Sequence, residues 1–408
     1  MWNDSFLSAT RIWSDRLCWS RGCAGSALLI LLFFSGCTAE TTVSVPTPLP
    51  AERDKVLYDV AGHQGVSGND GDDGPAIECT LFWPSDITIT PTGEILVVDW
   101  NNNRIRRIGT DGIIHHYIGS GQIGDGRTGD ASQARFNHPT EIKVGPDGTY
   151  WISAFFNWCI KNVDPVTLNI IQVLGDTVRG YRGDYPQNGG SLDADAKPRF
   201  DLPSSLVFDP AGNLYFCDQG NTRIRKIDLQ TRVISTFVGG TRGDLDGVGE
   251  AAQFSFPGCS CFWPDPVRLE ISPTGEDIYV ADAENHRIRK INIATRMVTT
   301  IAGTGEPGYS GHGRPALTAQ LNYPQDLAVS ISGDLYIADS HNHVIRKIDS
   351  SGTITTVAGN GVAGSSPNGT PAVLASLYSP TGIAFDDATH TLYIADTYNQ
   401  QIKKVINP

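Results

Sequence analysis

The chain has 408 residues, of which 44 are Gly and 24 are Pro, and only 18% are charged. The charge content is too low for a disordered chain and the content of Gly and Pro too high for a helical one, so composition favours short strands joined by turns. The formal net charge of −13 is opposite in sign to the field that attracts phosphate backbones, which argues against nucleic acid as a partner.

Residues 1–36 have the pattern of an export signal. Residues 24–36, AGSALLILLFFSG, form an apolar run that is too short to span a bilayer as a helix. Basic residues precede this run, namely Arg11, Arg16 and Arg21. We therefore expect residues 1–36 to be removed on export.

Cys37 follows the apolar run directly, after Phe33-Phe34-Ser35-Gly36. This junction resembles the lipobox of bacterial lipoproteins, which implies that Cys37 is lipidated and becomes the new N-terminus. Residues 37–54 are polar and rich in Pro and are predicted to form a tether, and Thr38 implies the outer membrane by the family's rule. The expected location is the bacterial cell envelope, with the lipid as the only contact with the membrane. The alternative is an ordinary secretory signal with an incidental cysteine.

Five cysteines follow Cys37 in the exported chain. An oxidising compartment permits disulfides among them, but the odd number leaves at least one unpaired. They are Cys79, Cys159, Cys217, Cys259 and Cys261.

One segment recurs six times between residues 83 and 408. Each copy holds a β-type run, a Gly or Asp turn, a second run that ends in Asp in five copies, a turn with Asn three residues later, and a third run; all but the last add a fourth run. Such a unit predicts a four-stranded antiparallel meander, and radial repetition of such units is typical of a β-propeller. We number the copies as blades one to six by their leading prolines, Pro84, Pro139, Pro203, Pro264, Pro324 and Pro380.

The copies share the core AD-x-x-N-x-R-I-R-K-I, which reads ADAENHRIRKI at residues 281–291. This core, together with Gly-rich links that end in an apolar residue and Pro, resembles the NHL-repeat family over residues 55–408. The resemblance implies an all-β chain folded as a six-bladed β-propeller.

The last copy ends at Pro408 without a fourth run. Residues 55–62, KVLYDVAG, match the runs at 299–303 and 355–359 that close other copies. Because an open sheet would expose an unpaired edge, we expect this N-terminal strand to complete blade six and close the ring.

The links between blades and the turns between second and third strands emerge on one face of such a propeller, which we call the top face; the other is the bottom face. The links are long and rich in Gly, as in GSGQIGDGRTGDASQ at residues 119–133. Binding sites usually lie on adaptable loops of a rigid scaffold, so the top face is the expected site.

The first position of each blade that faces the channel, two residues after the leading Pro, is acidic in three blades. These residues are Asp86, Glu141 and Asp326; the other blades have Ser205, Pro266 and Gly382, with Asp265 one residue before Pro266. Converging carboxylates could hold Ca²⁺, which takes six to eight oxygen ligands. The alternative is a wet channel mouth whose acids never meet.

The turn after the second strand carries aromatic residues in blades six, one and two. Contiguous exposed aromatics mark recognition surfaces, so these residues are the predicted partner surface. The alternative is that Phe155 and Trp158 fill gaps between blades, because blade two has Ala154 in place of the turn Asp. The predicted surface comprises Trp100, Phe155, Phe156, Trp158 and Tyr398.

Three histidines occupy the same turn in blades four and five, namely His286, His341 and His343. Three imidazoles would suit zinc. Because His belongs to the repeat itself, a structural role is favoured. The recurring Asp and Asn of the turn are likewise expected to be structural, since Asp accepts turn N–H groups and Asn tolerates the left-handed conformation.

The sequence has no Ser-His-Asp arrangement, no Gly-x-Ser-x-Gly elbow, no phosphate loop and no His-Glu-x-x-His motif. We therefore predict a monomeric, envelope-anchored binding scaffold that presents its top face to a protein, peptide or glycan. The alternative, which rests on resemblance to other propellers, is a Ca²⁺-dependent lactonase-like or a metal-dependent lyase-like enzyme. Only the channel acids have counterparts in those enzymes.

Overall fold

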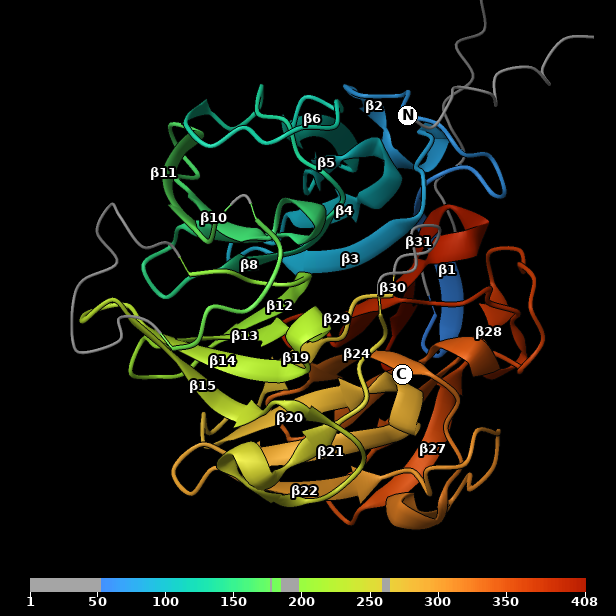
Figure 1. Ribbon diagram of the computed structural model, residues 1–408. Helices are drawn as coiled ribbons and strands as arrows, with labels where there is room; N and C mark the ends of the chain where they lie inside the picture. Colours follow the sequence, from blue (N-terminus) through green and yellow to red (C-terminus); the bar gives the residue numbers. More distant parts are fainter. Residues whose placement is uncertain (1–52, 177, 185–197, 259–264) are drawn as a thin grey trace, which may run out of the picture. The chain divides into compact units, whose positions relative to one another are not determined.

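The computed structural model describes residues 53–176, 178–184, 198–258 and 265–408, and within them every regular element is a strand or a short 3-10 turn. Six antiparallel sheets follow one another along the chain (Figure 1). The prediction of an all-β, six-bladed β-propeller is confirmed. Cys37, the predicted signal at 1–36 and nearly all of the predicted tether at 37–54 lie outside the described residues. No helix in the described part is long and apolar enough to cross a membrane.

Each blade has four main strands. Blade one consists of β3 (Pro84–Ile89), β4 (Ile95–Asp99), β5 (Arg104–Ile108) and β6 (Ile113–Ile118), and blade two of β8 (Pro139–Val144), β9 (Tyr150–Ala154), β10 (Cys159–Val163) and β11 (Asn169–Leu174). Blade three consists of β12 (Pro203–Phe208), β13 (Leu214–Asp218), β14 (Arg223–Asp228) and β15 (Val233–Gly239), and blade four of β19 (Leu269–Ile271), β20 (Asp277–Asp282), β21 (Arg287–Asn292) and β22 (Met297–Ala302). Blade five consists of β24 (Pro324–Val329), β25 (Leu335–Asp339), β26 (Val344–Ile348) and β27 (Thr353–Ala358), and blade six of β29 (Gly382–Asp386), β30 (Thr391–Asp396), β31 (Gln401–Ile406) and β1 (Val56–Ala61).

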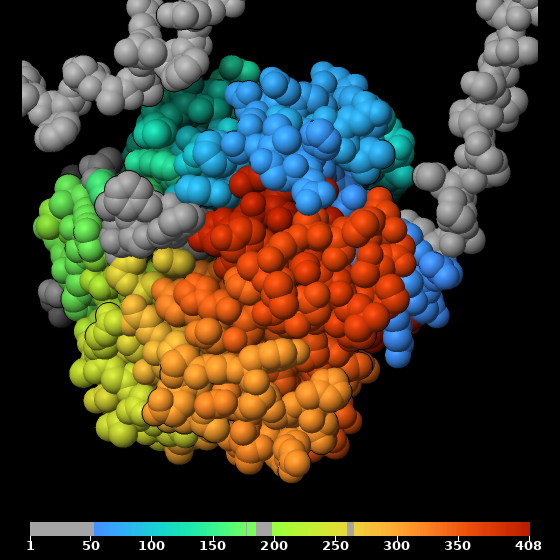
Figure 2. Space-filling view, turned by 90° about the vertical axis from the view of Figure 1, so that its right-hand side faces the viewer, coloured from blue at the N-terminus to red at the C-terminus, as the bar shows by residue number. Residues whose placement is uncertain are grey.

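The ring closes through the N-terminal strand, as predicted. β1 pairs antiparallel with β31, with Leu57 opposite Val405 and Tyr58 opposite Lys404. Figure 2 shows this blue segment against the orange and red segments of the last blade. Lys403 and Asp59 form an ion pair across the seam. The first and last strands of the propeller therefore share one sheet, which leaves no open edge there.

The links add a fifth, two-residue strand to the outer edge of five blades, which the sequence did not predict. Each short strand pairs with the outermost main strand of the blade that follows it, so the edge most exposed to solvent is partly covered. These strands are β2 (Gly74–Pro75), β7 (Gly129–Asp130), β17 (Gly247–Val248), β23 (Arg314–Pro315) and β28 (Thr370–Pro371). A parallel pair, β16 (Thr241–Arg242) and β18 (Gln253–Phe254), lies within the link to blade four.

Short 3-10 turns occur both in the links between blades and in the turns between second and third strands. Those in the links are η1 (Ala76–Glu78), η5 (Gly249–Ala251), η7 (Ala316–Thr318) and η9 (Ala372–Leu374). Those between the second and third strands are η2 (Trp100–Asn102), η3 (Phe155–Asn157), η4 (Gln219–Asn221), η6 (Ala283–Asn285), η8 (Ser340–Asn342) and η10 (Thr397–Asn399).

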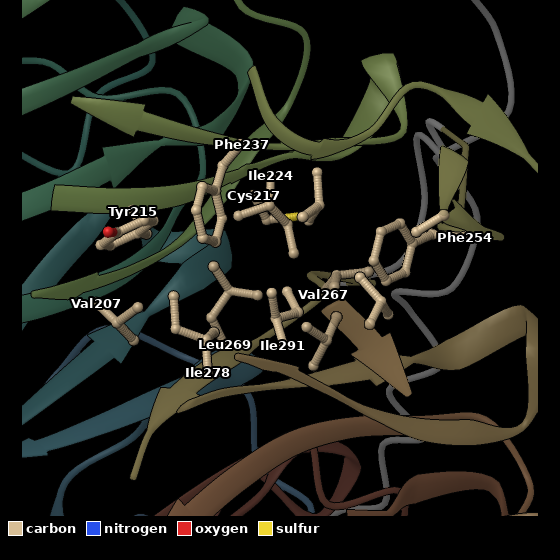
Figure 3. Packing of buried hydrophobic residues seen from close by; sticks show 14 of the residues in the cluster. Val207, Tyr215, Cys217, Ile224, Phe237, Phe254, Val267, Leu269, Ile278 and Ile291 are labelled. Carbon is tan, nitrogen blue, oxygen red and sulfur yellow. The ribbon is translucent and has the colours of Figure 1, made fainter. Parts of the chain in front are cut away.

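The hydrophobic core lies between neighbouring sheets. Figure 3 shows the cluster between blades three and four, where Tyr215 and Ile224 of one sheet meet Leu269 and Ile278 of the next. Burying each such aliphatic side chain contributes roughly 1.5–3 kcal/mol, so every blade is stabilised by both of its neighbours. The thiols of Cys79, Cys159 and Cys217 are free and buried in this kind of packing, and Cys259 and Cys261 lie outside the described residues.

The Asp and Asn of the repeat hold the top-face turns, so the predicted structural role agrees with the contacts, but the means differ from the prediction. The left-handed residue is the one after the Asn, such as His343 in blade five, and the Asp accepts a backbone N–H of the preceding link. In blade five, Asp339 Oδ1 accepts a hydrogen bond from Asn322 N at 2.7 Å, and Asp339 Oδ2 accepts one from Asn342 Nδ2 at 2.8 Å. Asn342 also donates to Gly308 O at 2.7 Å and so ties the turn to the preceding link.

Candidate functional site

The channel-facing position of blade four is occupied by Arg268, not by Pro266. In blade one Asp86 lies opposite Val98, the residue before the turn Asp. In blade four the residue before the turn Asp is Ala281, and its N–H donates to Arg268 O at 3.1 Å. Arg268 is therefore the equivalent of Asp86. The assignment of Pro264 as the leading proline was therefore wrong by two residues, and Pro266 is the equivalent of Pro84. The sequence itself distinguishes the two prolines. The bottom-face turn begins seven residues after the leading proline in blades one to three, and in blade four Pro273 lies seven residues after Pro266.

Arg268 reaches across the channel and is fully buried. Its Nη2 donates to Ser85 O at 3.1 Å and to Thr140 O at 2.6 Å, and its Nη1 donates to Ser204 O at 3.1 Å. One guanidinium thus joins blade four to the first strands of blades one, two and three. In the described structure this side chain lies across the channel, between its top and bottom ends.

The three predicted channel acids gather around Arg268. Its guanidinium lies 3.9 Å from Asp86 Oδ1 and 4.0 Å from Glu141 Oε1. Burial opposes the charge on Arg268, but the attraction of Asp86, Glu141 and Asp326 outweighs it and raises the pKa of Arg268. Burial raises the pKa of Glu141 to about 8 and that of Asp326 to about 7, against the opposing effect of the nearby basic groups. All three acids are buried and lie within the electrostatic reach of one guanidinium, which differs from the alternative of a wet channel mouth.

Backbone N–H groups and one hydroxyl group already donate hydrogen bonds to the carboxylates of Glu141 and Asp326. Glu141 accepts hydrogen bonds from Ser205 Oγ and Leu206 N. Asp326 accepts hydrogen bonds from the backbone N–H groups of Leu327 and Ile383. Sequence analysis missed Arg268, whose guanidinium supplies the cation that these acids require.

This arrangement does not fit calcium. Ca²⁺ would have to displace a buried guanidinium that bonds three carbonyls, and among the described residues no group of three His, Cys, Asp or Glu is placed to hold a metal ion. Calcium binding by Asp86, Glu141 and Asp326 remains a prediction without support from their geometry.

The predicted aromatic surface forms part of a longer track on the top face. Its rings follow one another at centroid distances of 4.3–6.2 Å and connect blades two, one, six and five. Aromatic pairs at these separations attract one another beyond simple burial. The track runs through Phe156, His138, Trp100, Trp83, Tyr398, Tyr378 and His343.

The five residues of the predicted partner surface divide between its two interpretations. Trp100 and Phe155 are buried and fill space beneath the surface, whereas Phe156, Trp158 and Tyr398 are half-buried at it. Sequence analysis missed Trp83, His138 and Tyr378. Trp83 and His138 stand directly before the leading prolines, where a left-handed backbone directs the chain into the first strand. Burial lowers the pKa of His138 to about 4, so its ring is neutral at pH 7.

Acidic and phenolic groups lie on the same face in blades four and five. Tyr323 stacks on His341 with a centroid distance of 4.4 Å. Asp265 accepts a hydrogen bond from Gln325 Nε2 at 3.0 Å, and burial raises the pKa of Asp265 to about 6. Glu284 forms an ion pair with Arg242. The top face therefore joins an aromatic track to polar groups that can bind by hydrogen bonds.

Two of the three histidines act as latches between blades. His286 Nδ1 accepts a hydrogen bond from Tyr323 N, and His343 Nδ1 accepts one from Ser379 N, both at 3.1 Å. In blade six Gln400 Oε1 does the same for Trp83 N at 2.7 Å. His286, His343 and Gln400 occupy the same position of the repeat, directly after the turn Asn, and each accepts a backbone N–H of the next blade. Hydrogen bonding between blades therefore accounts for the two histidines without a metal.

Comparisons with known proteins agree with this architecture. The model of the NHL repeat matches residues 83–108, and the model described as the teneurin NHL domain matches residues 264–370. Protein SUPPRESSOR OF QUENCHING 1, chloroplastic, from Arabidopsis thaliana is 33% identical over 161 residues, which are 37% of this chain and 14% of the plant protein. Human NHL repeat-containing protein 2 is 26% identical over 302 residues, covering 68% of this chain and 40% of the human protein.

A solved structure, described as an auxiliary nutrient binding protein from Bacteroides ovatus, superimposes with a TM-score of 0.61. It is 15% identical and covers 86% of this chain and 76% of its own, a likeness that shows the fold alone. The chain spans less than half the length of the curated relatives above. The recurring motif, the matched repeat models and the six sheets together show a six-bladed β-propeller that carries NHL repeats.

Proposed function

We propose that this protein is an envelope-anchored binding scaffold that holds a peptide, protein or glycan on its top face. The observation that carries the proposal is the aromatic track from Phe156 to Tyr398. Half-buried rings such as Trp83 and Tyr398 offer flat apolar surfaces, on which sugar rings or peptide side chains can stack. Polar groups at Asp265 and Glu284 would orient such a ligand.

The described residues give more support to binding than to catalysis. The channel acids, which are the feature shared with propeller enzymes, are engaged by Arg268 and by backbone N–H groups. The description of a structural neighbour as a nutrient binding protein fits a binding role, although that likeness is one of fold.

A ligand screen with matched variants tests the top-face proposal. The purified chain is titrated with oligosaccharides and with peptides, and binding is followed by calorimetry. We expect Trp83→Ala and Tyr398→Ala to weaken binding at least tenfold, because each removes a stacking surface. Tyr58→Ala, which changes an equally half-buried ring on β1, is the control and should leave binding unchanged. Binding that survives both top-face substitutions would contradict the proposal.

The envelope anchor is a separate part of the proposal, and Cys37→Ser tests it. Without the lipid we expect the protein to move from the membrane fraction to the soluble fraction, since a lipid chain is the only predicted attachment. Retention of the variant in membranes would contradict lipid anchoring while leaving the top-face proposal intact.

A further inference from the structure

Two adjoining hollows lie on the bottom face, where the first strands of the blades end. Their volumes are about 500 and 270 Å³, and Val144 and Val329 line both. We call the two together the lower vestibule. A space of this size suits a small organic molecule.

One residue of each repeat contributes an apolar side chain to the lower vestibule. The fifth residue after the leading proline is apolar and half-buried in all six blades, and each of these residues lines a hollow. They are Ile89, Val144, Phe208, Ile271, Val329 and Phe385. Ile331 extends the apolar wall at the rim, where it is 76% exposed and blades one to four have Pro. Exposed apolar residues gathered around a hollow are typical of a binding site.

The inner hollow also contains an ion pair. Lys143 Nζ lies 3.3 Å from Glu270 Oε2 and 3.8 Å from Glu141 Oε1, and the Lys143 and Glu270 side chains remain 26% and 20% exposed. The attraction of Glu270, Glu141, Asp86 and Asp326 outweighs the effect of burial and raises the pKa of Lys143, so this group stays cationic.

Acidic groups outnumber basic ones in this region. Lys143 is the basic residue among those that line the two hollows, whereas Glu270, Asp209 and Asp387 are acidic. Behind them, Arg268 faces the three channel acids. Lys143 is paired with Glu270, so an anion would have to compete with that carboxylate for the lysine. Asp209 and Asp387 form no ion pair among the described residues, so the lining carries more negative than positive charge and favours a cation.

We propose that the lower vestibule binds a small organic cation, with its ammonium group beside Glu270 and its apolar body against Val144, Phe208 and Ile331. Arg268 lies across the channel above this site, so the ligand enters and leaves by the bottom face. The site is therefore separate from the top-face surface, and either can exist without the other.

Two probes of the same shape and opposite charge test the proposal, 2-phenylethylammonium and 3-phenylpropionate. Calorimetry on the purified chain should show binding of the ammonium at least tenfold tighter than of the carboxylate. Glu270→Gln should weaken ammonium binding at least tenfold. Glu276→Gln makes the same change in the exposed bottom turn of the same blade, outside the lining, and should have no effect.

Ile331→Asn provides a second variant that leaves all buried charges in place, and it should weaken ammonium binding about threefold or more. If Glu270→Gln fails to fold, this variant decides. Equal or tighter binding of the carboxylate, no binding of either probe, or ammonium binding that neither variant weakens would overturn the proposal.

Discussion

Blades two and five make the same top-face turn with different side chains. In blade five Asp339 accepts the N–H of Asn322, and Arg346 places its guanidinium 3.6 Å from the same carboxylate. In blade two the equivalent residues are Ala154 and Lys161. There Asn157 Oδ1 takes over the acceptor role and receives the N–H of Asn137 at 2.8 Å.

The backbone is almost unchanged by this exchange. Both turns are 3-10 helices that end in a left-handed residue, Trp158 with φ 53° and His343 with φ 56°. Lys161 is buried like Arg346 and donates to Gly126 O at 2.6 Å. The turn thus requires an acceptor for one backbone N–H, and does not require Asp.

The largest effect is expected from removing the carboxylate where the turn depends on it. Asp339→Ala would leave Asn322 N without its acceptor and the buried Arg346 without its partner, so unfolding free energy should fall by about 3–5 kcal/mol. Urea unfolding measures this value. Ser350→Ala, an exposed change in the bottom turn of the same blade, should have little effect. A loss below about 1 kcal/mol for Asp339→Ala would show that blade five does not depend on the carboxylate.

A smaller effect should distinguish the two asparagines. Asn157→Ala removes the acceptor for Asn137 N and the donor to Gly124 O, which should cost about 2 kcal/mol. Asn342→Ala removes only donors, because Asp339 continues to accept from Asn322, and should cost about 1 kcal/mol. Equal losses in urea unfolding would mean that Asn157 does not replace the missing Asp.

The histidine latch of blade five should make the free energy of unfolding depend on pH, and a glutamine latch should not. Burial lowers the pKa of His343, and its Nδ1 must be unprotonated to accept from Ser379 N. Its contribution is therefore present above the unfolded pKa of about 6.5 and is lost as pH falls below it. His343→Gln copies the latch of blade six, so it should match the original chain at pH 8 and lose less stability toward pH 5, by up to about 1 kcal/mol.

The difference in unfolding free energy between the original chain and His343→Gln, measured at each pH, isolates the contribution of this residue. Buried carboxylates act with the opposite sign: burial raises the pKa of Asp339 to about 7, and that contribution is common to both chains. Blade two has Trp158 at the latch position, which offers no acceptor and does not titrate. A pH dependence that is identical with His343 and with Gln would contradict the latch.

The smallest effect is expected from restoring the repeat in blade two. Ala154→Asp places a carboxylate next to Asn157 and on the same strand pair as Lys161, so new hydrogen bonds and charge pairing should roughly offset its desolvation. We expect unfolding free energy to change by less than about 1 kcal/mol. A loss as large as that of Asp339→Ala would show that the aromatic neighbours of blade two have made its turn incompatible with Asp.

The sequence by itself determined the strands, the six blades and the closure by residues 55–62. These features follow from alternating apolar residues, turn signals and repetition, which are local and repeat at a readable interval. The structural role of the turn Asp and Asn was also assigned correctly, although two of their partners, Asn322 N and Gly308 O, lie in the preceding link and not in the turn. The wrong position assigned to blade four came from choosing Pro264 over Pro266, although the distance to the bottom turn distinguishes them.

Only the tertiary structure decided what meets at the centre and at the two faces. Arg268 bonds carbonyls of three other blades, separated from it by 64 to 183 residues, and no local pattern specifies such a partner. The same holds for Trp83 and Tyr398, which share the aromatic track although one begins the first blade and the other lies in the last. Ring closure brings these distant residues together, and the packing between blades then determines which of them are buried and which remain available to a ligand.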